Sequence, residues 1–207
     1  MASIGSIGTL PALNGSVKRH LITLAAVFLA QVLAAPLSCA TLERLTLDDM
    51  ISKSSAIVRG KVTDSWAAFT GSVIYTHYRI QASETYKGAS RNLLEIVVTG
   101  GTVNGIRQNF SGSPRLNQGD EFVFFLWTSK AGLTQIIGLT QGLFAVPPDD
   151  SRTPASDPSS DPIVTRAPTR ELMLDPATAR PVKDAALSMR LSELRSRIAN
   201  TRAPGAN

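Results

Sequence analysis

Residues 74–86 read Ile74-Tyr75-Thr76-His77-Tyr78-Arg79-Ile80-Gln81-Ala82-Ser83-Glu84-Thr85-Tyr86. The even positions from 74 to 82 are mostly apolar, whereas the odd positions are mostly polar or charged. A period of two residues is the pattern of a β-strand with one buried face. The stretch therefore predicts one long strand, with Tyr75, His77 and Arg79 on its outer face.

Five shorter segments around this stretch also carry strand patterns. They are Ala56–Val62, Leu94–Val98, Glu121–Trp127, Leu133–Gly138 and Leu143–Val146. Glu121–Trp127 is apolar on both faces, which predicts a strand covered on two sides. Strands that recur at intervals of roughly 10 to 20 residues, separated by turn-forming glycines, predict a mainly β fold. We expect a small antiparallel β-barrel, OB-like, of about six strands.

Two short helices accompany the predicted strands. Thr46 offers a hydroxyl N-cap and Asp49 follows three residues later, a variant of the capping box that predicts a short N-terminal helix. Near the C-terminus, apolar residues recur at helical spacing and predict a short amphipathic helix over Ser188–Ala199. These apolar residues are Leu191, Leu194 and Ile198. A helix of this length is not stable alone in water, so we expect it to dock on the barrel or to stay partly unfolded.

Composition changes sharply near Pro147 and Pro148. Every aromatic residue after position 40 lies before this point. Residues 149–166 are mainly Asp, Ser, Pro and Thr, and they offer too little apolar surface to offset the entropy cost of ordering. The sequence therefore predicts a β-barrel domain over 41–148 and a flexible linker or tail over 149–182. Residues 183–207 are predicted to hold the C-terminal helix and a disordered end.

The first 40 residues have the pattern of a secretory signal peptide. Lys18 and Arg19 precede an apolar run from Leu21 to Leu33, which is shorter than the roughly 20 residues needed to span a bilayer. Small residues follow the run and predict cleavage between Ala40 and Thr41. The sequence thus predicts an exported protein, periplasmic or extracellular, with no stable membrane span after cleavage.

Two alternatives to cleavage at Ala40 remain open. Cys39 is the lipidation site in a lipoprotein signal, although Pro36 fits poorly at the third position before the cysteine. In the second alternative, the signal is not cleaved and its apolar run serves as a membrane anchor.

Export also limits the chemistry that remains. Cys39 is the single cysteine of the chain, so the predicted mature chain has no disulfide scaffold. Cleavage removes two basic residues and no acid, which lowers the formal charge from +5 to +3. The remaining Lys and Arg residues are scattered rather than gathered in a stripe, so we do not expect a nucleic-acid partner.

Two stretches resemble a known group of exported domains. Ala56–Val62 leads to the long strand that ends in Tyr86-Lys87-Gly88, and Gly119–Leu126 reads as a glycine, two acids and an apolar run. This pattern resembles the netrin-like and metalloproteinase-inhibitor-like OB barrels. The layout also resembles exported bacterial proteins, including the segment Leu174–Thr178 and the terminal helix. The resemblance covers residues 41–148 and implies the barrel, whereas a partner outside the cytosol is expected from the predicted export.

One departure limits what the resemblance implies. Inhibitors of this group chelate the catalytic zinc of their protease through an N-terminal cysteine. In this chain the predicted mature N-terminus is Thr41. The zinc-chelating mechanism is therefore not expected here.

The remaining sequence carries few groups suited to catalysis. His77 is the single histidine after position 40, whereas triads and zinc sites require a histidine with further oriented ligands or partners. The paired acids are Asp48-Asp49, Asp120-Glu121 and Asp149-Asp150. The first pair suits the start of a helix, the second points to opposite faces of a strand, and the third lies in the predicted linker, so none of them is expected to form a catalytic pair. Gly100–Gly105 predicts a hairpin connection rather than a phosphate loop. We therefore expect no catalytic residue, no metal site and no cofactor, although a hydrolase that uses acids alone stays a minor alternative.

Aromatic and basic side chains provide the candidate partner site. Trp66 and Phe69 fall in a predicted loop over residues 65–72, and Tyr75, His77 and Arg79 share the outer face of the long strand. Aromatic residues beside arginine on a barrel face suit ligand binding. The sequence predicts a non-enzymatic exported binding module for a protein or carbohydrate partner. The alternative is an inhibitor-like or accessory domain for a secreted protease, acting through Thr41 onward or residues 65–72.

Overall fold

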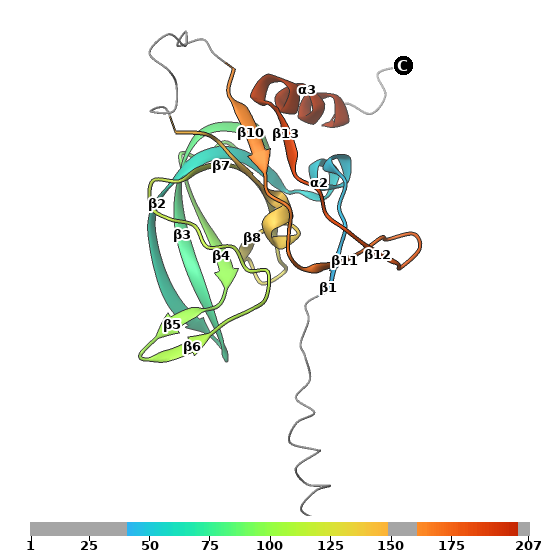
Figure 1. The fold of residues 1–207 in the computed structure, drawn as a ribbon. Coiled ribbons are helices and arrows are strands. Elements are labelled where there is room, and N and C mark those ends of the chain that lie inside the picture. The colour runs from blue at the N-terminus through green and yellow to red at the C-terminus, as the bar shows by residue number, and fades with distance from the viewer. Residues whose placement is uncertain (1–40, 149–160, 203–207) are drawn as a thin grey trace, which may run out of the picture. The chain divides into compact units, whose positions relative to one another are not determined.

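The computed structural model describes residues 41–148 and 161–202 (Figure 1). The predicted signal peptide, with Cys39 and Ala40, lies outside these residues, as does the Asp- and Ser-rich segment 149–160. The elements in chain order are β1 (Thr41–Glu43), α2 (Leu47–Lys53), β2 (Ala56–Thr70), β3 (Val73–Lys87), β4 (Leu93–Thr99), β5 (Gly101–Val103), β6 (Ile106–Gln108), β7 (Glu121–Thr128), β8 (Thr134–Ile136), the 3-10 helix η1 (Leu139–Gly142), β9 (Leu143–Ala145), β10 (Ile163–Arg166), β11 (Leu172–Leu174), β12 (Pro181–Val182), β13 (Leu187–Arg190) and α3 (Leu191–Arg202).

The main feature is a curved antiparallel sheet of eight strands. Its hydrogen-bonded order is β13-β10-β9-β7-β2-β3-β4, and β8 pairs with β7. Figure 1 shows that the long strands β2 and β3 bend and give the sheet a concave side, which we name the hollow side, while α2 and α3 lie together at one end. The predicted mainly β, antiparallel fold with two short helices is confirmed. The described strand pairs form an open path rather than a closed ring.

Both faces of β7 are covered, as its apolar pattern predicts. Phe124 and Leu126 point into an inner core on the hollow side, together with Tyr78 and Ile80 of β3. Val123 and Phe125, on the other face of the same strand, belong to an outer core beneath the helices. The helical residues of that outer core are Leu47, Met50, Ile51, Leu191, Leu194 and Ile198. The C-terminal helix therefore docks on the sheet through the apolar residues that the sequence predicts.

Local signals place α2 as expected. Thr46 accepts a hydrogen bond from the Asp49 backbone at 3.1 Å, and the Asp49 carboxylate accepts from the Thr46 backbone at 3.0 Å. Hydrogen bonds from the Thr46 side chain and backbone lower the pKa of Asp49 below its ordinary value. The predicted capping box is thus complete.

The prediction of a loop over residues 65–72 is wrong, because most of this segment belongs to the long strand β2. The strand continues through Trp66 and Phe69 to Thr70, and only Gly71 and Ser72 turn the chain into β3. Register irregularities interrupt the β2–β3 ladder at three places. At Gly60 an added Cβ would lie 2.7 Å from the carbonyl oxygen of Gln81, so glycine permits the close approach of the two strands.

The prediction of a flexible linker over 149–182 is wrong for its described part. Residues 163–166 form β10, which joins the main sheet between β9 and β13, and β11 and β12 lie at 172–174 and 181–182. A separate three-stranded sheet pairs β11 with β12 and, in parallel, with β1. The C-terminal helix begins at Leu191 rather than Ser188 because residues 187–190 extend as β13.

One buried ion pair explains why this polar segment is ordered. The guanidinium of Arg166 donates to both carboxylate oxygens of Asp184 at 2.8 Å, and their side chains are 6% and 4% exposed. Asp184 also accepts from the backbone amide of Thr169 at 2.8 Å. The pair thereby fixes the chain between β10 and β11, which contributes one wall of the cavity described below.

Candidate functional site

The outer-face cluster comprises Asp64, Trp66, His77, Arg79 and Glu95. Trp66 lies opposite His77 in the β2–β3 ladder, and the two rings stack at 5.2 Å between centroids and 13° between planes. The guanidinium of Arg79 lies 5.2 Å from the Trp66 ring centroid. The structure therefore brings together three of the five residues predicted to bind a partner.

Of the other two predicted residues, one shares the face of this cluster and the other does not. Tyr75 is on the same face but pairs with Ala68, one step further along the hairpin. Phe69 pairs with Ile74, so it points to the opposite face of the sheet from Trp66. The five residues do not form one continuous binding surface.

The polar groups of the outer-face cluster are largely occupied by one another. His77 Nδ1 lies 2.7 Å from Glu95 Oε1, and Arg79 pairs with Asp64 at 3.2 Å. The His77 side chain is only 14% exposed, and its Nε2 is buried without a hydrogen-bond partner. Among the described residues, no group of three or more His, Cys, Asp or Glu is arranged to hold a metal ion. The cluster is a cross-strand stack that stabilises the hairpin.

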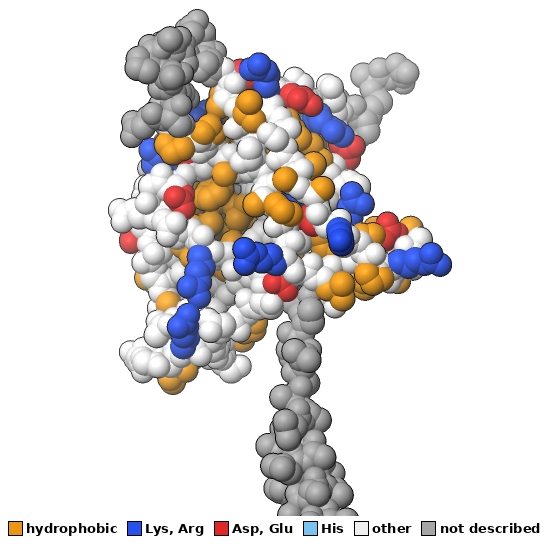
Figure 2. Space-filling model, in the orientation of Figure 1, with side chains coloured by type: hydrophobic (Ala, Val, Ile, Leu, Met, Phe, Trp, Pro, Cys, Tyr) orange, Lys and Arg blue, Asp and Glu red, His pale blue; other side chains and the backbone are white. Residues whose placement is uncertain are grey.

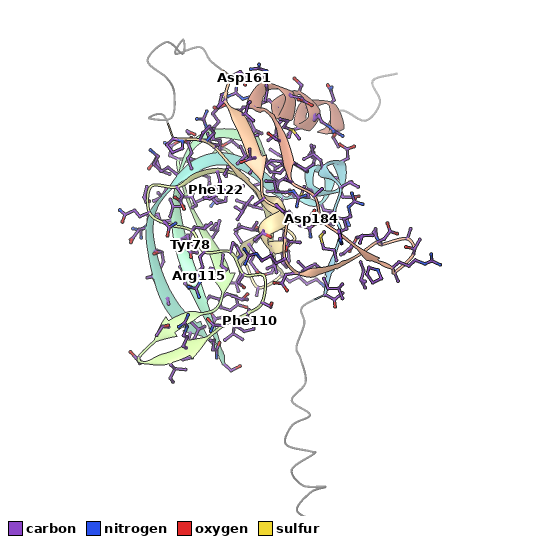
Figure 3. The ribbon with its side chains drawn as sticks, viewed as in Figure 1. Tyr78, Phe110, Arg115, Phe122, Asp161 and Asp184 are labelled. Carbon is purple, nitrogen blue, oxygen red and sulfur yellow. The ribbon has the colours of Figure 1, made fainter. Side chains whose placement is uncertain are left out.

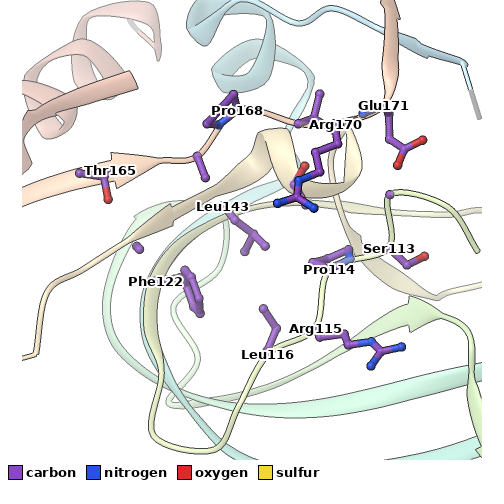
Figure 4. Close-up of a pocket in the computed structure, with 15 residues that line it drawn as sticks. Ser113, Pro114, Arg115, Leu116, Phe122, Leu143, Thr165, Pro168, Arg170 and Glu171 are labelled. Carbon is purple, nitrogen blue, oxygen red and sulfur yellow. Dashed lines mark hydrogen bonds between the residues drawn. The ribbon is translucent and has the colours of Figure 1, made fainter. Parts of the chain in front are cut away.

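A cavity opens instead on the hollow side of the sheet. This cavity, named the main cavity for its mostly apolar lining and not for its size, has a volume of about 370 Å³ and lies between β7, β9, β10 and the segments 112–116 and 167–171. Figure 3 places Phe122 and Tyr78 inside the curve of the sheet, and Figure 4 shows the main cavity in close-up. Its apolar lining is formed by Pro114, Leu116, Phe122, Leu143, Ala145 and Pro168.

A second cavity lies on the other side of segment 113–116. This side cavity has a volume of about 420 Å³ and is lined by β3, β4, β5 and residues 107–110. Both cavities share Ser113, Pro114, Arg115 and Leu116. The segment thus divides one hollow into an apolar and a more polar compartment.

Several hydrogen bonds hold the walls of the main cavity in place. The Ser111 hydroxyl donates to Glu171 Oε2 at 2.9 Å and joins the two wall segments. The hydroxyls of Thr99 and Ser113 lie 3.0 Å apart, and the Leu116 amide donates to the Tyr78 hydroxyl at 3.4 Å. The walls are therefore fixed from both sides, which is typical of a preformed binding site.

Charge at the rim is predominantly positive. The charged residues lining the two cavities are Arg107, Arg115, Arg170 and Glu171. Neither Arg115 nor Arg170 forms an ion pair with a carboxylate in 41–148 or 161–202. Figure 4 shows the guanidinium of Arg170 reaching over the main cavity toward Leu143, and Figure 2 shows basic side chains beside apolar surface on this face.

Sequence reasoning did not identify this cavity. Phe122 and Leu143 read as strand residues, and Arg115 and Arg170 read as scattered surface charge. The one local signal is that each arginine lies one or two positions after a proline in a turn-rich segment, Pro114-Arg115 and Pro168-Thr169-Arg170. That signal does not reveal that the two segments meet.

Comparisons with known proteins give no relative. No protein-family model matches the chain, and neither a curated protein nor a solved structure matches it. In the described part of the chain, none of the helices has the length and apolar character required to cross a bilayer. The geometry of the chain itself therefore carries the functional argument.

Proposed function

We propose that this protein is a non-enzymatic exported binding module whose ligand occupies the main cavity. The observation that carries the proposal is a preformed cavity with an apolar floor and a few charged groups at its rim. Cavities of this size and character are the usual sites of small-molecule binding. The outer-face cluster is a weaker candidate because its polar groups already bind one another.

Export rests on the sequence of residues 1–40. The position of β1 supports the proposed cleavage site, since Thr41 is already in a strand that pairs with Leu172 of β11. Cleavage after Ala40 would leave every element of the described residues intact. Periplasmic and extracellular destinations both fit this proposal.

The OB-like classification belongs to the same proposal. The strongly curved strands β2 and β3, with their irregular register, support it, as does the approach of β4 to β8 with Cα atoms within 8 Å. We propose that the sheet is a partly open relative of the netrin-like and metalloproteinase-inhibitor-like barrels. β10 and β13, which follow residue 148, are additions to that plan.

The protease-inhibitor alternative receives less support. It requires an inserting segment, and the two candidates were Thr41 onward and residues 65–72. Thr41–Glu43 pairs with β11, and residues 65–70 pair with β3. Because backbone groups in both segments are engaged in ladders, a binding cavity is the better-supported site.

A ligand screen by thermal shift tests the proposal. The matched variants are Ala167→Trp, which places a large side chain at the cavity wall, and Ala186→Trp, an exposed site outside both cavities. We expect at least one small molecule to raise the Tm of the wild type and of Ala186→Trp but not of Ala167→Trp. A panel whose hits all stabilise the three proteins equally contradicts the proposed location.

A further inference from the structure

We infer that the ligand of the main cavity is a small anionic amphiphile, with its apolar chain among Leu116, Phe122 and Leu143 and its acidic head at Arg170. This inference rests on the proposed function and assigns a ligand class to the same cavity. Three separate features support it: the apolar lining of the cavity, the positive charge of its rim and the hydrogen-bond pairing of the strands around it.

The lining selects an apolar chain. Leu116 and Leu143 belong to the inner core, and Phe122 packs against it, so the floor of the cavity continues the hydrophobic interior. Its volume of about 370 Å³ suits a molecule the size of a medium alkyl chain. Transfer of such a chain from water is favourable in proportion to its buried apolar area.

The rim selects an anion. Arg115 and Arg170 stand on the two walls of the main cavity, and Arg107 borders the adjoining side cavity. Glu171 is the single carboxylate among the lining residues, and the Ser111 hydroxyl binds it. A carboxylate or phosphate head accepts strong, often bidentate hydrogen bonds from a guanidinium, so charge complementarity favours an acidic head over a neutral or cationic one.

The backbone around the cavity argues against an extended peptide. Recognition of a peptide strand uses free backbone groups along a sheet edge. At this site β9 lies between β7 and β10, with Ala145 opposite both Phe122 and Thr165. β7 and β10 are therefore paired on both sides, and β9 is paired with β7 along its length and with β10 at Ala145. Few strand backbone groups remain for a peptide at this site, so a ligand without a peptide backbone is the better fit.

Calorimetric titration with sodium decanoate tests the inference. We expect decanoate to bind the wild type, and we expect acetate and decyltrimethylammonium, which lack the chain or the negative charge, not to bind. Arg170→Ala should weaken decanoate binding by about 10-fold, and Arg170→Lys should weaken it less. The matched control Arg91→Ala removes the same charge from an exposed position that lines neither cavity, and it should bind like the wild type.

Several outcomes overturn the inference. Equal affinity for the anionic and cationic amphiphiles contradicts the proposed role of the arginines. Unchanged decanoate affinity in both rim variants, Arg170→Ala and Arg115→Ala, contradicts it as well, provided that circular dichroism confirms that both variants are folded. Binding to phosphatidylglycerol vesicles without binding to free decanoate shows that a membrane surface is the partner instead. If another ligand discriminates Ala167→Trp from Ala186→Trp while decanoate does not bind, the ligand class is wrong and the binding module stands. Equal decanoate binding by both tryptophan variants contradicts the cavity itself.

Discussion

Substitution of Asp184 by alanine should destabilise the protein strongly, although the residue lies just beyond the segment predicted to be a flexible linker. Asp184 accepts two hydrogen bonds from Arg166 and one from the Thr169 amide, each at 2.8 Å. Asp184→Ala leaves the Arg166 guanidinium buried with a single remaining acceptor, the carbonyl of Ala185 at 2.7 Å. The Thr169 amide, in the wall of the main cavity, loses its acceptor as well.

The magnitude follows from the burial of the pair. Side chains that are 6% and 4% exposed are poorly screened by water, and removal of one partner from a buried pair costs about 3–5 kcal/mol. We take the lower end, about 3 kcal/mol, because Arg166 keeps one acceptor. For a protein of this size, each kcal/mol lowers the Tm by about 2–4 °C, so we expect a decrease of about 6–12 °C.

The effect should depend on pH in a defined direction. Burial alone would raise the pKa of Asp184, but hydrogen bonds from Arg166 and the Thr169 amide and the charge of Arg166 outweigh it and hold the pKa below its ordinary value. A carboxylate with a lowered folded-state pKa stabilises the fold above its unfolded pKa of about 3.9, and this contribution is lost as the pH falls through the folded pKa. The gap between wild type and Asp184→Ala should therefore narrow below about pH 4.

Calorimetric or circular-dichroism melts of the purified protein measure this gap. The control is Asp64→Ala, which removes a carboxylate from the exposed Arg79 pair, with side chains 45% and 54% exposed. An exposed pair contributes about 0–1 kcal/mol, so this variant should melt within a few degrees of the wild type. If Asp184→Ala lowers the Tm no more than Asp64→Ala does, the reasoning about the buried pair is refuted.

Three further substitutions test the fold. Gly60→Ala should cost about 1–3 kcal/mol in urea denaturation, because the added Cβ would lie 2.7 Å from the Gln81 carbonyl oxygen; a neutral result would show that the strands separate easily. Leu194→Ala should cost about 2–5 kcal/mol, since the side chain is fully buried, and a loss below 1 kcal/mol would mean that α3 is not firmly docked. Thr46→Ala should cost about 1 kcal/mol at pH 7. Hydrogen bonds from Thr46 lower the pKa of Asp49, so this cost should shrink below about pH 4, and a cost that grows there would contradict the capping box.

Local patterns predicted the elements whose stabilising contacts are local or periodic. The capping box at Thr46, the alternation of residues 74–82 and the two-sided apolar character of β7 each appear in the structure as expected. The glycine-rich stretch 100–105 also belongs to a hairpin, in which residues 101–103 form β5 and residues 104 and 105 turn the chain into β6. In all four cases the decisive interaction lies within a few residues or follows the strand period.

Elements that depend on distant partners were not predictable in the same way. β10 spans four residues in a polar context, and its order depends on Arg166 contacting Asp184, 18 positions later. Trp66 looked like a loop residue because its partner His77 is known only once the β2–β3 register is fixed. The cavity is the extreme case, since Arg115 and Arg170, 55 positions apart, line one cavity only because the fold brings their two segments to it.

The most direct test of the central claim is a map of amide chemical-shift changes in the ¹H–¹⁵N spectrum during titration with decanoate. If decanoate occupies the main cavity, the largest changes should fall at Leu116, Phe122 and Leu143 and on the wall segment 167–171. Changes confined to Trp66 and His77, or spread evenly over the surface, would contradict the claim that the hollow side of the sheet is the binding site.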